Sequence, residues 1–191
     1  MTILPIDEIN ALEDKLKPHF EDDGKGKIKS RQDAEDIIDE LLDLFLLSYA
    51  NGATATNTEL GTAVMPPVDA VDAAVYRPVA GETWRDRVMG YYESGGTLYD
   101  IRRIAETDAT RLYNQGAVDA VVANGATGVS KRWRTMNDDR VRDTHDYLEG
   151  MVVPFDERFY TYDNDSAMFP GDFEFPENNI GCRCVVEVIR G

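Results

Sequence analysis

Apolar residues in the first half of the chain recur at helical spacing and predict two helices. The first pattern spans Ile6–Leu16. The second begins after Ser30, a residue suited to cap a helix, and we expect it to end at Asn51 and Gly52. Its apolar stripe consists of Ala34, Ile37, Ile38, Leu41, Leu42, Phe45 and Tyr49, and it is widened by Leu44, Leu46 and Leu47. A stripe this broad needs burial against another helix, in this chain or on a partner.

The middle of the chain predicts a linker followed by two further helices. Residues 53–67 are rich in Ala, Thr and Gly and end in two prolines, a composition typical of a linker. Next comes a helical block in which Trp84, Val88 and Tyr91 share one face. A longer helix is expected over residues 97–123, where apolar positions again recur every three or four residues.

Beyond residue 125 the pattern changes to short apolar runs separated by turn residues, which predicts strands. The expected elements are strands at residues 129–133, 151–154 and 182–189 and a short, charged helix at residues 138–147. The fold class that follows is α+β, with a helical N-terminal half and then a small module of short antiparallel strands with one short helix. We divide the chain into a helical N-terminal region with its linker, residues 1–66, and a second domain, residues 67–191. The second domain is expected to be helical over residues 67–125 and α+β over residues 126–191.

The C-terminal module is expected to fold around one compact core, because its strands and helix place apolar side chains next to turn residues. Trp133 has the largest of these side chains, so its burial is expected to contribute most. The predicted members are Trp133, Val141, Leu148, Val153, Phe155 and Val185.

Composition narrows the range of functions. The 191-residue chain carries 36 acidic and 20 basic residues, which gives a net charge of -16. A surface this acidic repels phosphate backbones, so contact with nucleic acid is expected to be local and indirect at most. No apolar run approaches the roughly 20 residues of a membrane helix, and residues 1–10 lack the basic start of a secretory signal. We therefore expect a cytoplasmic product with no membrane partner.

Two cysteines, Cys182 and Cys184, are predicted to lie on the last strand, where residues i and i+2 project to the same face. Two interpretations of this pair remain open. In one, the thiols share a zinc ion with His145 and one carboxylate, Asp139 or Asp143. In the other, which we favour, no metal or other cofactor binds and the cysteines pack as small hydrophobic residues. In both, the thiols stay reduced and at least one lies near His145.

A local basic cluster with one aromatic residue interrupts the acidic chain. It comprises Lys131, Arg132, Trp133, Arg134, Arg140 and Arg142. Contact with nucleic acid is one interpretation, but Asp138, Asp139 and Asp143 are interleaved with the arginines. We favour an internal network of ion pairs, because one arginine can hold two carboxylate oxygens at once. Arg142 in particular is expected to pair with carboxylates of its own module.

Several short motifs follow one another in a fixed order in the second domain. Trp84 with its flanking charged residues comes first, and Thr107, Asp108, Arg111 and Asn114 follow on the long predicted helix. The remaining positions are Trp133, Thr135, Asp139, Arg142, His145, Gly150, Phe159, Pro170, Cys182, Arg183 and Cys184. Their order and spacing together resemble the phage Mu F-like head morphogenesis family, the minor head proteins of tailed phages. The resemblance covers over half of the chain and leaves out the residues before about position 70.

The resemblance implies a structural protein without enzymatic activity that takes part in assembly of the phage head near the portal. It implies the portal protein, other head proteins and further copies of the chain as partners, and the virion and the host cytoplasm as locations. A part in DNA packaging or delivery is a further implication. The chain departs from the family's usual residues at Asp108, Glu149 and Gly181. The first two keep a carboxylate, whereas Gly181 removes a side-chain amide.

An enzyme is the alternative of a different class. It would be a metal-dependent hydrolase or a toxin-like enzyme centred on His145, Asp139, Cys182 and Cys184, with zinc as its cofactor. A third interpretation is a zinc-stabilised binding module without catalysis. The chain has only two histidines, which leaves few candidates for histidine-based catalysis.

Overall fold

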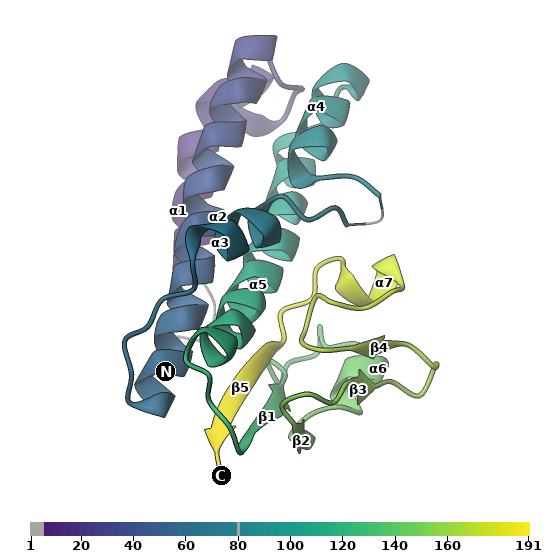
Figure 1. The fold of residues 1–191 in the computed structure, drawn as a ribbon. Coiled ribbons are helices and arrows are strands. Elements are labelled where there is room, and N and C mark those ends of the chain that lie inside the picture. Colours follow the sequence, from purple (N-terminus) through teal and green to yellow (C-terminus); the bar gives the residue numbers. More distant parts are fainter. Residues whose placement is uncertain (1–5, 80) are drawn as a thin grey trace.

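The computed structural model describes residues 6–79 and 81–191 of the chain. The first two thirds hold α1 (Ile6–Leu16), α2 (Arg31–Leu60), α3 (Val68–Val75), α4 (Trp84–Ser94) and α5 (Leu98–Ala123), with short 3-10 turns at Lys17–His19 and Glu21–Gly24. The remainder holds β1 (Val129–Arg134), α6 (Asp143–Asp146), β2 (Val152–Pro154), β3 (Phe159–Tyr160), β4 (Ser166–Ala167), α7 (Pro176–Asn179) and β5 (Val185–Arg190). The α+β class predicted from the sequence is confirmed, and the helices stand together beside the small sheet (Figure 1).

Helix α2 is longer than the sequence predicts. Ser30 caps its first turn as expected, because its Oγ accepts a hydrogen bond from the backbone at 3.1 Å. The predicted end at Asn51 and Gly52 is wrong, since the helix continues to Leu60. Gly61 then ends it with a left-handed φ of 68°, a conformation that glycine adopts without strain. Residues 53–60 of the predicted linker are therefore helical.

Two glycines explain why α2 continues, because they let α2 and α5 approach each other closely. A Cβ atom added at Gly52 would lie 1.8 Å from the backbone oxygen of Tyr113 on α5. One added at Gly116 on α5 would lie 2.1 Å from the backbone oxygen of Tyr49 on α2. Beside this contact, the Tyr49 hydroxyl donates a hydrogen bond to Asp119 at 2.7 Å. Gly52 is a packing residue of the helix pair and not a helix stop.

The apolar stripe of α2 is buried mostly within the chain itself. It packs in one cluster with residues of α1, α3, α4 and α5. Trp84 of α4 is part of this cluster and packs edge to face with Phe45, with the ring centroids 5.1 Å apart. Its Nε1 donates a hydrogen bond to the Val75 backbone oxygen at 3.0 Å. Of the residues that widen the stripe, Leu46 and Leu47 remain 40% and 44% exposed. The need for burial is met largely inside this chain, and a small apolar strip is left on the surface.

The sheet has the order β2-β1-β5, and both strand pairs are antiparallel. The strands predicted at residues 129–133 and 151–154 are present with small shifts of their ends. The last strand begins at Val185, three residues later than predicted. Cys182 and Cys184 therefore precede β5, and the prediction that they lie on the strand is wrong. The segment that holds them crosses from α7 to β5 beside α5 (Figure 1).

The charged helix predicted at residues 138–147 is reduced to the single turn α6. Asn137 takes a left-handed backbone with φ of 57°, and the Asp138 carboxylate accepts a hydrogen bond from the Arg140 backbone at 3.1 Å. Side chains that bond to nearby backbone in this way form turns at the expense of helix. Val141, which was predicted in the core, lies half-exposed in this loop and outside the core clusters.

A second core fills the C-terminal module. Trp133 and Leu148 are fully buried in it, as predicted. Val185 is buried but lies outside this cluster, in which its neighbour Val186 takes part. Val153 and Phe155 are half-buried and pack against the same cluster. Every second residue of β1 is buried, so alternate side chains of this strand face the core.

Among residues 6–79 and 81–191, no helix combines the length and the apolar character that a membrane span requires. The two longest helices, α2 and α5, both carry several charged residues. Residues 1–5, part of the segment compared with a secretory signal, lie outside the described residues.

We predict that Gly52→Ala lowers the free energy of unfolding by about 1–3 kcal/mol, because the added methyl group forces α2 and α5 apart. Urea denaturation at constant pH measures the change. Gly90→Ala in α4 is the matched control, since a Cβ atom there meets nothing within 4 Å. The higher helix propensity of alanine should make that variant roughly 0.5–1 kcal/mol more stable. Equal effects of the two substitutions would contradict the close contact between the helices.

Candidate functional site

Three side chains with metal-binding and redox chemistry meet in the core of the C-terminal module. His145 lies on α6, and Cys182 and Cys184 lie in the segment just before β5. The Nδ1 atom of His145 is 3.6 Å from the Sγ atom of Cys182 and 3.5 Å from that of Cys184. All three residues are buried, and both thiols are free. The expectation that a cysteine lies near His145 is confirmed for both cysteines.

Aromatic rings and a buried amide fix the positions of these side chains. The imidazole of His145 stacks on Phe173 with the ring centroids 5.2 Å apart, and it meets Trp133 edge-on at 5.6 Å. The backbone oxygen of Cys184 accepts a hydrogen bond from Asn114 on α5 at 3.0 Å. The site is therefore shaped by α5, β1 and the loop before α7, and not by α6 alone.

The two thiols differ in acidity. The hydrogen bond with Cys184 lowers the pKa of the Cys182 thiol well below its usual range, and His145 adds to this effect while burial opposes it. The same contact and burial together raise the pKa of the Cys184 thiol. A buried pair of this kind shares one proton more easily than it holds two negative charges. The site offers two sulfur atoms of different acidity and one imidazole.

A narrow cleft leads to His145 and Cys184. Its other lining residues are Met136, Arg140, Val141, Arg142, Gly181 and Arg183. Arg183 binds both carboxylate oxygens of Asp138, at 2.8 and 2.6 Å. Arg142 was expected to pair with carboxylates, but it donates to the backbone oxygen of Ile180, a carbonyl that the short helix α7 leaves free at its end. Both guanidinium groups hold the walls of the cleft together.

Asn114, in the middle of α5, joins the helices to the C-terminal module. Its side-chain N–H groups donate to the backbone oxygens of Pro170 at 3.1 Å and Cys184 at 3.0 Å. Its Oδ1 accepts from the backbone N–H of Val186 at 2.7 Å. The residue is fully buried. A buried amide with its donors and acceptor satisfied holds the segments that it contacts in one relative position.

One turn earlier on α5, Arg111 and Asp108 form a buried network of charges. Arg111 Nη1 donates to the backbone oxygen of Ala74 at 2.9 Å, and its Nη2 lies 3.3 Å from Asp108 Oδ1. Arg87 of α4 approaches the other oxygen of the same carboxylate at 2.5 Å. Burial lowers the pKa of Arg111, and Asp108 opposes that shift. The network ties α3, α4 and α5 together.

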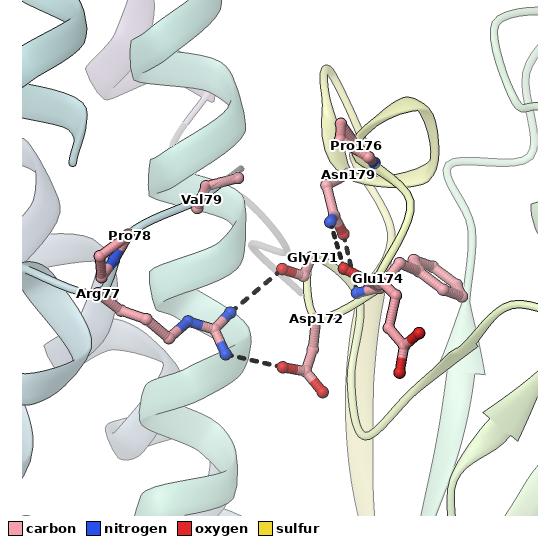
Figure 2. Close-up of a pocket in the computed structure, with 9 residues that line it drawn as sticks. Arg77, Pro78, Val79, Gly171, Asp172, Glu174, Pro176 and Asn179 are labelled. Atoms are coloured by element: carbon pink, nitrogen blue, oxygen red, sulfur yellow. Dashed lines mark hydrogen bonds and ion pairs between the residues drawn. The ribbon is translucent and has the colours of Figure 1, made fainter. Parts of the chain in front are cut away.

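Arg77, which follows α3, makes a second bridge to the C-terminal module (Figure 2). Its Nη1 donates to Asp172 at 2.7 Å and its Nη2 to the Gly171 backbone oxygen at 3.3 Å. The guanidinium group also lies over the ring of Phe169, 5.8 Å from its centroid. A Cβ atom at Gly171 would come within 2.9 Å of the side chain of Arg111, so this loop lies directly against α5.

A scan against protein-family models matches residues 79–187 to the family described as Phage Mu protein F like protein. The matched segment makes up more than half of the 191 residues and contains the bridging helix α5 and the buried His–Cys–Cys group. The chain belongs to this family. As a Mu F-like protein, it is a phage head morphogenesis protein and a component of the virion. A search of curated proteins and a search of solved structures each found no match.

Most of the Mu F-like motif positions lie around one core. Trp133 and Phe159 pack edge to face with their ring centroids 5.2 Å apart. Gly150 forms the turn after α6 with φ of 74° and donates its backbone N–H to the Trp133 oxygen at 2.9 Å. The backbone N–H of Thr135 donates to Glu149 at 2.5 Å. Glu149 is one of the departures from the family's usual residues, and its carboxylate still accepts a hydrogen bond from the backbone.

Asp139 is not part of this group. It lies exposed in the loop before α6, where the turn at Asn137 replaces the predicted helix. In the described part of the chain, the possible metal ligands that gather around His145 are Cys182 and Cys184 only. The structure thus does not bring the carboxylate of the enzyme interpretation to the site.

The Mu F-like basic cluster contains the internal ion pairs that we expected. Arg132 lies 3.1 Å from Glu187 on the neighbouring strand, and Arg134 lies 3.1 Å from Glu149. With Arg183 bound to Asp138, these pairs draw the arginines of this region toward carboxylates of the same module. Arg140 and Arg142 make no ion pair among the described residues, so these pairs neutralise part of the cluster's positive charge.

Lys131 of the basic cluster faces inward, which was not predicted. It is fully buried, and its Nζ atom lies over the rings of Phe155 and Phe159, 5.6 and 5.5 Å from their centroids. Burial lowers the pKa of Lys131 to about 8. The sequence held a signal for this position, because Lys131 is two residues from Trp133 and therefore shares its face of β1.

A second group of donors, at the start of α2, was also not predicted. His19 Nδ1 lies 3.1 Å from Asp33 and 3.9 Å from Asp36. Hydrogen bonding to Ser30 lowers the pKa of Asp33, and His19 contributes further. The group is partly exposed, and its position is explained by the capping of α2, because Asp33 bonds to the cap residue Ser30.

We predict that Asn114→Ala lowers the free energy of unfolding by about 2–4 kcal/mol, since it leaves several buried backbone groups without partners. Chemical denaturation followed by circular dichroism measures the loss. Gln115→Ala removes an amide from the same helix, but that amide bonds to Asp119 at the half-buried surface. Its effect should stay within about 0.5 kcal/mol. A similar loss in both variants would show that Asn114 is not a bridge.

We predict that Lys131→Met stabilises the protein at pH 7, because it removes a charge from an apolar site. The pKa of Lys131 is about 8 in the folded chain, below the value of about 10.4 in an unfolded chain. The unfolded chain therefore binds more protons between these values, so wild-type stability gains from a rise in pH through this window. The advantage of the variant should shrink from about pH 8 to about pH 10.4. Denaturation at several pH values tests this, and a constant advantage would contradict it.

Proposed function

We propose that this Mu F-like chain is a structural minor head protein without enzymatic activity that docks near the portal during head assembly. One observation carries the proposal: two polar motif residues of α5, Arg111 and Asn114, are buried and bonded to the chain's own backbone. Asn114 bonds to Pro170 and Cys184, and Arg111 bonds to Ala74. Side chains engaged in this way maintain a shape and have few bonds left to offer a substrate.

The enzyme alternative receives less support from the same site. Metal-assisted hydrolysis needs a base or a carboxylate beside the metal donors to activate water. Among the described residues, no carboxylate joins His145, Cys182 and Cys184, and Asp139 is exposed in a separate loop. Any contact with DNA during packaging or delivery is proposed to be indirect, because Arg132 and Arg134 of the basic cluster are paired within the module and the chain has a net charge of -16.

The proposed docking surface is the strip of α2 that carries Leu46 and Leu47. Leu47 also lines a groove between α1 and α2, together with Ala11 and Leu12. Glu8, Lys15, Glu40 and Asp43 border the same groove, which makes its frame mainly acidic. An apolar strip in an acidic frame is complementary to a partner with an apolar patch and a basic rim. We propose the portal protein as that partner, in the host cytoplasm before the head is complete.

We predict that the double variant Leu46→Asp, Leu47→Asp reduces recovery of the chain with the portal protein by at least about tenfold, because charges replace the apolar contact. Co-purification of the two proteins from one expression host measures it. Deletion of residues 1–66 is a poorer test, since α2 forms part of the core with α5.

Val122→Asp is the matched control, because Val122 is an exposed apolar residue on α5, outside the proposed surface. It should leave recovery and the melting temperature unchanged. Equal recovery of wild type and the double variant would remove the docking role from α2. Loss of self-association alone, with portal recovery intact, would assign the strip to contacts between copies of the chain.

A further inference from the structure

We infer that His145, Cys182 and Cys184 together form a binding site for one Zn²⁺ ion. The donor atoms of the three residues lie within 4.8 Å of one another, and all three residues are buried. This site involves these donors only and does not depend on the docking surface of α2. It also differs from the enzyme alternative, because the ion would hold the module together and would not act on a substrate.

The distances from the imidazole nitrogen to the two sulfurs fit a tetrahedral zinc ion. Zinc binds sulfur at about 2.3 Å and nitrogen at about 2.0–2.1 Å, so two such ligands in tetrahedral geometry lie about 3.6 Å apart. The Nδ1 atom of His145 is 3.6 Å from one sulfur and 3.5 Å from the other. A single ion can therefore bond to His145 and to either sulfur at normal bond lengths, and the two sulfurs lie within 4.8 Å of each other.

Hydrogen bonds alone satisfy the group less completely. Nδ1 of a neutral imidazole has one acceptor lone pair, yet two thiols lie at contact distance from it. Only one thiol can donate to that lone pair, and the other thiol is left with a weak contact. One zinc ion in place of the thiol protons would bond to all three atoms, and two thiolates would balance its charge.

The surroundings hold the donors in place before an ion arrives. His145 is packed between the rings of Phe173 and Trp133, and Asn114 anchors the backbone at Cys184. Arg183, between the two cysteines, is bound to Asp138, so it leaves both sulfurs free to face the imidazole. Donors fixed in this way lose little entropy on binding.

The chemistry of the donors selects the ion. Two sulfurs and an imidazole suit zinc, whereas calcium and magnesium require oxygen ligands. Among the described residues, a fourth protein donor does not reach the group. His145 and Cys184 also line a narrow cleft, and a water molecule there would complete the fourth position. The ion would connect α6 to the segment before β5, two parts of the module with little regular structure.

The first test titrates zinc into the full chain after metal removal with a chelator under reducing conditions. A competing colorimetric chelator reports the affinity, and the melting temperature is measured with and without zinc. We expect one zinc ion per chain and a higher melting temperature with zinc. Cys182→Ser and Cys184→Ser should each lower the affinity at least about tenfold. His19→Asn should leave it unchanged, because His19 belongs to the separate group at α2.

No zinc binding by the folded wild type would overturn the inference, as would unchanged affinity in both cysteine variants or loss of binding in His19→Asn. A second measurement needs no variant and so does not depend on whether the variants fold. Cobalt added to the wild-type chain should give a sulfur-to-metal charge-transfer band and the strong visible bands of a tetrahedral complex. A weak spectrum typical of octahedral oxygen ligation would refute the site.

Discussion

The arrangement of the two halves of this chain depends on one buried amide, the side chain of Asn114. From the middle of α5 it bonds to the loop at Pro170, to the segment at Cys184 and to β5 at Val186. Each bond that failed to form would leave a polar group buried without a partner. The loop, the cysteine segment and β5 therefore have one favourable position against α5. The geometry of the His–Cys–Cys group follows, because Cys184 lies on the segment so held.

The charged bridges beside Asn114 also fix the relative positions of the helices and the C-terminal module, but through ion pairs. Moving Arg111 and Asp108 out of water costs several kcal/mol, and their bonds to Ala74 and Arg87 offset that cost. Networks of this kind add little net stability, yet a displaced helix would leave a buried charge unpaired. Arg77 extends the constraint to the loop at the module's surface (Figure 2). The resulting rigidity suits a protein proposed to present one fixed surface during assembly.

Local patterns in the sequence predicted the features that depend on local rules. The Ser30 cap, the stripe of α5 and the strands follow from residue spacing. The end of α2 was predicted wrongly, because Gly52 resembles a stop unless its contact with the distant α5 is known. The cysteine segment was placed on a strand for a similar reason, since only its tertiary contact with α5 shows that β5 starts later. Lys131 shares the inward face of β1 with Trp133, because alternate residues of a strand face the same side. Its charge nevertheless argued against burial.

The family match starts at residue 79, yet the core to which it belongs extends beyond it. Helix α2 lies outside the match and packs along α5, whose apolar residues Ile101 and Leu112 are fully buried. Exposure of such side chains costs roughly 1.5–3 kcal/mol each, so the matched segment needs α2 in order to keep this core. The family motifs thus maintain a shape, while α1 and α2 cover it with a surface that lies outside the match. The proposed docking strip on α2 is part of this surface. A partner that binds the strip would therefore recognise a region of this protein that the family motifs do not determine.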